Sequence, residues 1–86
     1  MKKYNSEVIN SSIYTLLGEN IIVFCRNYIY SGKLIGVDSD YIILGDARIV
    51  YDTGPLCGNT FTNAQSLPSQ WFIQLSTVES YGISGR

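Results

Sequence analysis

The stretch that most constrains the fold spans residues 30–47 and reads YSGKLIGVDSDYIILGDA. Two glycines, Gly32 and Gly36, interrupt its first half, which otherwise favours a β-strand. Glycine inside a strand usually marks a sharp bend or a place where another backbone approaches closely. The second half holds a short apolar run, Tyr41-Ile-Ile-Leu, of residues common in strands. Between the halves, Asp38-Ser39-Asp40 has short polar side chains that can bond their own backbone, as in a tight turn. The pattern therefore predicts two strands of a small, strongly curved barrel.

The length of 86 residues indicates one domain with a limited capacity to bury surface. Small β domains often compensate by closing the sheet on itself or by associating with other chains. Charged residues make up only 15% of the chain, whereas seven residues are tyrosines. This composition fits a chain that covers part of its surface with a partner, and it fits a tightly packed monomer equally well.

The charge balance argues against several functions. The formal net charge is −1, whereas a protein that binds duplex DNA is expected to carry a basic face. Single-stranded RNA stays compatible with this charge, because base stacking and backbone contacts can carry much of the affinity. The chain has no histidine, so it lacks histidine-based catalytic and metal sites. With no phosphate-binding loop and no convincing carboxylate pair either, we expect a non-catalytic protein without a cofactor or metal and without duplex DNA as a partner.

The two cysteines, Cys25 and Cys57, lack the spacing of a zinc site or of a disulfide framework. Met1-Lys-Lys is not followed by an apolar core of the kind that signal peptides have. The longest apolar run, residues 21–25, is much too short to cross a membrane. We therefore expect a soluble, cytoplasmic domain with no membrane partner.

Periodicity predicts one helix followed by strands. Apolar residues recur on one face over residues 6–17, which predicts a helix. The stretch 52–69, with its Gly-Pro, Gly-Asn and Pro breakers, is predicted as a long loop. Short runs of strand-forming residues predict strands over residues 21–25, 28–37, 41–51, 70–75 and 77–81. A helix and five short antiparallel strands favour an SH3-like or an OB-like barrel.

Two segments carry a family resemblance. The first, Tyr30-Ser31-Gly32-Lys33-Leu34-Ile35-Gly36-Val37-Asp38, has the spacing aromatic-x-Gly-x-Leu-x-x-(Phe/Val)-Asp. The second reads Trp71-Phe72-Ile73-Gln74-Leu75-Ser76-Thr77-Val78. Together they resemble the two motifs of the Sm/LSm/Hfq family, over about residues 6–83 without the long loop. The resemblance implies that residues 1–86 form a single Sm-like domain. This domain is mainly β, with an N-terminal helix followed by a strongly bent five-stranded antiparallel SH3-like barrel.

The resemblance also implies a homo-oligomeric ring, which in this family holds about five to eight subunits, joined head to tail. An open barrel leaves an unpaired strand on each side, and the strands over 70–75 and 77–81 would form the contact. Strand alternation places Trp71 and Phe72 on opposite faces. The residues predicted for the subunit interface are Trp71, Phe72, Ile73, Leu75, Val78 and Tyr81.

Members of this family bind single-stranded U- or A-rich RNA, stacking on one base and reading its edge. The resemblance places the stacking position on Asp40, or on Tyr41 if the loop is one residue out of step. The base-reading Asn falls on Ile42 or Ile43, and the supporting Arg-Gly falls on Gln74-Leu75. The RNA-binding positions predicted for this chain are Ser39, Asp40, Tyr41, Gln74 and Ser76.

Two functions stay open on this basis. A carboxylate at Asp40 repels RNA, and Gln74 in place of arginine removes a strong phosphate partner. The Lys-His of the Hfq type is also missing, since Phe72-Ile73 stands there. The chain is predicted to be a ring-forming ribonucleoprotein component that binds single-stranded RNA. The alternative is a ring-forming scaffold or protein-interaction module that has lost the RNA site.

Overall fold

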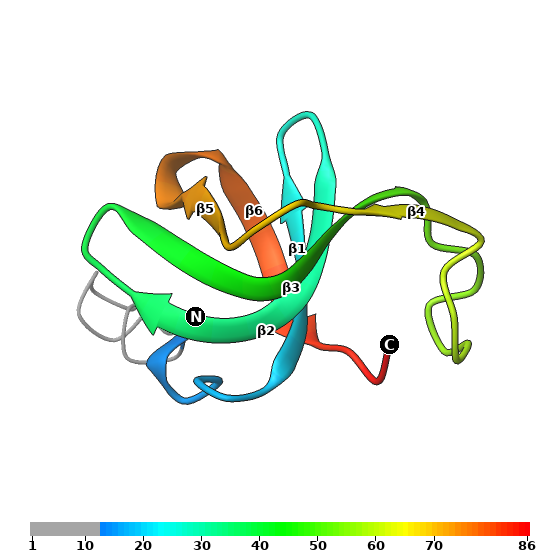
Figure 1. Ribbon diagram of the computed structural model, residues 1–86, viewed down its shortest axis with the longest axis horizontal. Coiled ribbons are helices and arrows are strands. Elements are labelled where there is room, and N and C mark those ends of the chain that lie inside the picture. Colours follow the sequence, from blue (N-terminus) through cyan, green and yellow to red (C-terminus); the bar gives the residue numbers. More distant parts are fainter. Residues whose placement is uncertain (1–12) are drawn as a thin grey trace, which may run out of the picture.

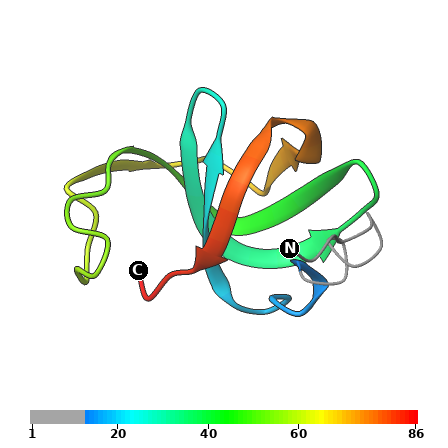
Figure 2. The same ribbon diagram turned by 180° about the vertical axis from the view of Figure 1, so that it is seen from behind.

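The computed structural model describes residues 13–86. The strands form one antiparallel sheet that curls into an open barrel (Figure 1). The strand order is β4-β3-β2-β1-β6, and β5 pairs with β3 beside this path. Figure 2 shows β6 alongside β1 on the reverse side of the barrel. The six strands within residues 13–86 are β1 (Asn20–Cys25), β2 (Ile29–Val37), β3 (Tyr41–Asp52), β4 (Asn63–Ser66), β5 (Trp71–Gln74) and β6 (Val78–Ile83).

The long strand β3 has two different partners along one edge. Its first half pairs with β5, with Tyr41 opposite Gln74, and its second half pairs with β4, with Arg48 opposite Ser66. Between the halves, Asp46 adopts a positive φ of 48°, which aspartate tolerates better than most residues. The end of β3, the following loop and β4 extend away from the barrel as an arm, residues 51–66 (Figure 1).

Gly32 lies where β2 and β3 approach each other most closely. A Cβ atom added at Gly32 would lie 2.8 Å from the carbonyl oxygen of Gly45 and 3.1 Å from the Cα atom of Ala47. The register between β2 and β3 shifts on both sides of Leu34, and irregularities of this kind bend a strand. This geometry confirms the close backbone approach predicted for Gly32.

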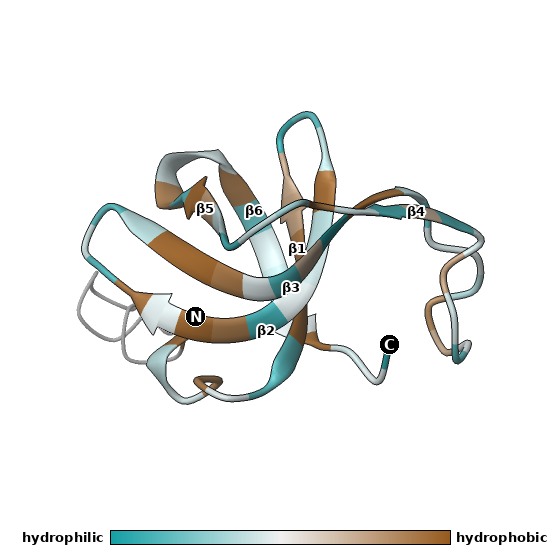
Figure 3. Ribbon diagram, in the orientation of Figure 1, coloured by the Kyte–Doolittle hydropathy of each residue, from teal (hydrophilic) through white to brown (hydrophobic). Residues whose placement is uncertain are grey.

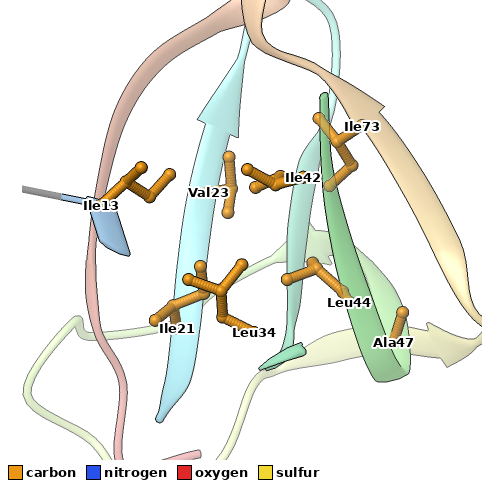
Figure 4. Close-up of a cluster of buried hydrophobic side chains, with 8 residues drawn as sticks. All are labelled: Ile13, Ile21, Val23, Leu34, Ile42, Leu44, Ala47 and Ile73. Atoms are coloured by element: carbon orange, nitrogen blue, oxygen red, sulfur yellow. The ribbon is translucent and has the colours of Figure 1, made fainter. Parts of the chain in front are cut away.

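The core lies inside the curl and consists of aliphatic side chains (Figure 4). Figure 3 shows hydrophobic residues along the first half of β3 and hydrophilic ones along β4, which lies outside the core. Eight buried residues form the cluster: Ile13, Ile21, Val23, Leu34, Ile42, Leu44, Ala47 and Ile73. Within residues 13–86, no helix is long and apolar enough to span a membrane.

The predicted number of strands was wrong, because the loop expected over 52–69 contains β4. The sequence of β4, Asn-Ala-Gln-Ser, shows no apolar alternation, since the arm exposes most of this strand to solvent. Periodicity detects burial, so it missed an exposed strand. The last strand also differs: Leu75–Thr77 forms a short 3-10 turn, and β6 runs from Val78 to Ile83 rather than over 77–81.

The helix predicted over residues 6–17 is not confirmed. Residues 6–12 lie outside the described residues. In the remaining part, Ile13 and Tyr14 are helical, and residues 15–18 form a turn. The amides of Leu16 and Leu17 donate to the carbonyl oxygens of Ile13 and Tyr14, a spacing of three residues that is tighter than that of an α-helix.

Candidate functional site

Two loops that are distant in the sequence meet at one end of β3. Residues 38–40 connect β2 to β3, and the 3-10 turn follows directly after β5. The pairing of β3 with β5 places Tyr41 opposite Gln74. The amide of Leu75 also donates to the carbonyl oxygen of Asp40 at 2.9 Å. These backbone contacts hold the two loops in a fixed arrangement.

The two loops line a pocket of about 490 Å³. The pocket contains every position that the family resemblance assigned to RNA contact, although the role of these positions stays a prediction. Leu75, which was predicted for the subunit interface, is the sixth residue. The lining residues are Ser39, Asp40, Tyr41, Gln74, Leu75 and Ser76. We call this site the loop pocket.

The conformation of the first loop depends on Asp38. Its carboxylate accepts hydrogen bonds from the hydroxyl of Ser39 at 3.2 Å and from the amide of Asp40 at 3.4 Å. The Asp38 amide donates to the carbonyl oxygen of Tyr41 at 2.8 Å. Aspartate commonly stabilises turns in this way. Asp38 therefore shapes the loop, and its neighbours line the pocket.

Tyr41 supplies an aromatic ring to the loop pocket. Its ring centroid lies 5.4 Å from that of Phe72, at an interplanar angle of 50°, and Phe72 is 57% exposed. Tilted aromatic pairs of this kind orient both rings. Trp71 packs against the core, so the prediction that Trp71 and Phe72 face opposite sides is confirmed. Of the two residues predicted for base stacking, Asp40 and Tyr41, only Tyr41 offers a ring.

The electrostatics of the loop pocket favour a neutral ligand group. Among residues 13–86, six residues line it, and Asp40 is the only charged one of these. Hydrogen bonds can instead come from the hydroxyls of Ser39 and Ser76 and from the amide of Gln74. This arrangement can read the edge of a base more readily than it can hold a phosphate.

The residues predicted for the subunit interface lie on and between two strands with open edges. In the part of the chain that the structure describes, β5 pairs only with β3, and β6 pairs only with β1. Phe72 is exposed, whereas Ile73 is 4% exposed and fills the core of its own chain. A contact of Ile73 with a second subunit would therefore come from its backbone. The other predicted residues pack partly against the core: Trp71, Leu75, Val78 and Tyr81.

A second polar pocket, of about 410 Å³, lies beside the second half of β3, and no sequence pattern predicted it. Its charged residues, Asp46, Arg48 and Arg86, are brought together by strand pairing and by the C-terminal segment. No local spacing connects Arg48 with Arg86, so a motif search could not have found this pocket.

The overall architecture is similar to that of a solved Sm protein. The structure of the Pyrococcus abyssii Sm protein in complex with a uridine heptamer superimposes with a TM-score of 0.65 at 18% sequence identity. The superposition covers 86% of this chain and 94% of that chain. No family model and no curated protein sequence matches this chain. The likeness shows that the chain has an Sm-like fold, as its sequence motifs predicted.

Proposed function

We propose that this protein is a non-catalytic Sm-like protein that binds single-stranded RNA at the loop pocket. The observation that carries the proposal is the convergence of all predicted RNA-binding positions in one pocket, on an Sm-like fold. Tyr41 offers a stacking surface, and neutral donors surround it. Stacking combined with contacts to base edges is the usual way in which proteins recognise single-stranded RNA.

We further propose that the chain forms a homo-oligomeric ring. The open edge of β5 in one copy would pair with the open edge of β6 in the next, and such head-to-tail contacts close into a ring when the rotation permits. Phe72, exposed on β5, would lie beside this contact. A ring of about five to eight subunits repeats the loop pocket once per subunit, so one flexible strand could occupy several pockets with a gain in affinity.

The proposal is tested by measuring the affinity of the purified protein for heptauridine and heptaadenosine at low salt. Base–aromatic stacking contributes roughly 1–3 kcal/mol per base, so Tyr41→Leu should weaken binding by roughly 5- to 150-fold per occupied pocket. Tyr41→Phe keeps the ring and should retain most of the affinity. The matched control is Tyr51→Leu, because Tyr51 is exposed at the far end of β3. Lack of affinity for both oligonucleotides would exclude the proposed function.

Native mass spectrometry without nuclease treatment tests the assembly. An integral number of chains with additional mass from bound RNA would support both parts of the proposal. A monomer would exclude the ring.

A second function, a ring-forming scaffold, is favoured by one observation. Within the described part of the chain, the loop pocket is lined by the Asp40 carboxylate and by no lysine or arginine. A bare ring that binds neither oligonucleotide, in the wild type or in the Asp40→Asn variant, would support the scaffold. An Asp40→Asn variant with increased RNA affinity would instead show that the pocket is built for RNA.

A further inference from the structure

A row of polar side chains crosses the outer face of the sheet next to the second pocket. The strand register places Arg48 of β3 directly between Ser31 of β2 and Ser66 of β4. Residues that lie directly opposite one another share a face of the sheet. Ala47, which precedes Arg48, is buried in the core, so alternation turns this row away from the core. Ser31, Arg48 and Ser66 all line the pocket of about 410 Å³, which we call the arginine pocket.

Two guanidinium groups at the arginine pocket share one aromatic ring. The Cζ atoms of Arg48 and Arg86 lie 4.8 and 4.3 Å from the ring centroid of Phe61. The Nη1 atom of Arg86 also donates to the carbonyl oxygens of Thr53 and Pro55 in the arm, at 2.9 and 3.1 Å. In Figures 1 and 2 the C-terminal segment lies between the barrel and the arm. These contacts fix both arginines in place without neutralising their charge.

The arginine pocket has unused capacity for an anion. Within residues 13–86, neither Arg48 nor Arg86 forms an ion pair with a carboxylate. The side chain of Ser31 is fully buried, and its hydroxyl donates to the main-chain oxygen of Arg86 over 3.5 Å, at the limit of hydrogen-bond geometry. This buried hydroxyl can form a shorter, more favourable hydrogen bond with a ligand than it forms with Arg86. Guanidinium groups bind phosphate oxygens through paired, charge-assisted hydrogen bonds.

We propose that the arginine pocket binds the phosphate of a ribonucleotide. Arg48 and Arg86 hold the phosphate oxygens, and the Ser31 hydroxyl donates to one of them. Asp46 lines the same pocket and carries a carboxylate that accepts hydrogen bonds from sugar hydroxyls or base amino groups. The volume lies within the range of roughly 300–1,000 Å³ that is usual for small-molecule sites.

The carboxylate of Asp46 restricts the kind of ligand. It repels a second phosphate, so the pocket suits a ligand with one phosphate beside neutral hydroxyl groups better than a bare polyanion. The phosphate can belong to a free mononucleotide or to one nucleotide of a single strand. The arginine pocket shares no lining residue with the loop pocket, so this inference does not depend on RNA binding there.

The test is a calorimetric titration of the whole chain with uridine monophosphate and adenosine monophosphate. Uridine and adenosine serve as probes without phosphate. Both monophosphates should bind at least about tenfold more tightly than the nucleosides, and Arg48→Gln should remove about tenfold or more of that affinity. The matched control is Arg26→Gln, because Arg26 is exposed in the turn between β1 and β2 and lies outside both the arginine pocket and the loop pocket. Circular dichroism confirms that each variant folds.

The source of the phosphate follows from heptauridine binding by the same variants. Weaker heptauridine binding in Arg48→Gln, together with weaker monophosphate binding, would assign the site to a nucleotide within a strand. A loss confined to the monophosphates would assign it to a free nucleotide. The proposal is overturned if Arg48→Gln changes the affinity for none of these ligands, or if Arg26→Gln weakens monophosphate binding equally. In Tyr41→Leu the preference for the monophosphates over the nucleosides should persist, because the loop pocket recognises the base and the arginine pocket recognises the phosphate; this separates the test from that of the loop pocket.

Discussion

Replacing Gly32 by alanine should destabilise the barrel more than a glycine-to-alanine substitution at any other glycine in the described strands. The added Cβ atom would lie 2.8 Å from the carbonyl oxygen of Gly45 and 3.1 Å from the Cβ atom of Leu44. Both neighbours belong to β3, whose position is fixed by pairing on both edges. Because a backbone oxygen cannot rotate away as a flexible side chain can, β2 and β3 must separate to accommodate the methyl group.

The expected loss follows from two opposing terms. Forcing an extra methyl group into a well-packed site costs about 1–3 kcal/mol. Alanine also restricts the unfolded chain, which offsets this cost by about 0.4–1 kcal/mol. The midpoints of these two ranges leave a net destabilisation of about 1.3 kcal/mol. This is a considerable part of the roughly 4–13 kcal/mol expected for a chain of this length. At about 4–8 °C per kcal/mol, the melting temperature should fall by roughly 5–10 °C.

Thermal unfolding followed by circular dichroism measures this effect. The matched control is Gly82→Ala in β6, because a Cβ atom at Gly82 would meet no other described residue within 4 Å, apart from the two chain neighbours of Gly82. Wild type and variants are compared at equal protein concentration, since association with further copies would raise the melting temperature. The reasoning is refuted if Gly32→Ala has the same melting temperature as the wild type. It is also refuted if Gly82→Ala lowers the melting temperature as much as Gly32→Ala does.

Three further predictions concern charge and backbone. Asp40→Asn should raise the affinity of the loop pocket for heptauridine, because it removes the only charge among the lining residues within the described part of the chain. An unchanged or lower affinity in anisotropy titrations would contradict this. Asp46→Gly should leave the melting temperature unchanged or raise it, whereas Asp46→Val should lower it, because a positive φ of 48° strains a β-branched residue most. Burial raises the pKa of the Cys25 thiol, so less of the reactive thiolate forms there at neutral pH. Iodoacetamide should therefore label the exposed Cys57 before Cys25, as measured by mass spectrometry of the peptides. Equal labelling of the two cysteines would contradict this prediction.

The fold was largely predictable because its signals are local. The spacing of Gly32 and Asp38 predicted the bend and the turn, and both appear in the structure as a close backbone approach and a carboxylate-stabilised loop. The arm was not predictable in the same way. Its strand β4 is mostly exposed, so no apolar periodicity marks it, and its position depends on pairing with the second half of β3.

The two candidate sites also differ in whether a local sequence pattern predicts them. The positions of the loop pocket could be predicted because a known motif places two loops together, and the pairing of Tyr41 with Gln74 joins them in the structure. The arginine pocket depends on contacts between Arg48, Phe61 and Arg86, which come from a strand, the arm and the C-terminal segment. Such long-range contacts leave no spacing in the sequence, so only the structure shows them.

The change of partner along β3 connects the two sites physically. The first half of β3 pairs with β5 and supports the loop pocket, whereas the second half pairs with β4 and supports the arginine pocket. Gly45 and Asp46 lie between these halves, and Gly32 of β2 packs directly against this junction. A substitution within one half should therefore change the geometry of one pocket only. Gly32→Ala acts at the junction and should weaken both the heptauridine and the monophosphate affinity; a loss confined to one of them would show that the halves of β3 move independently.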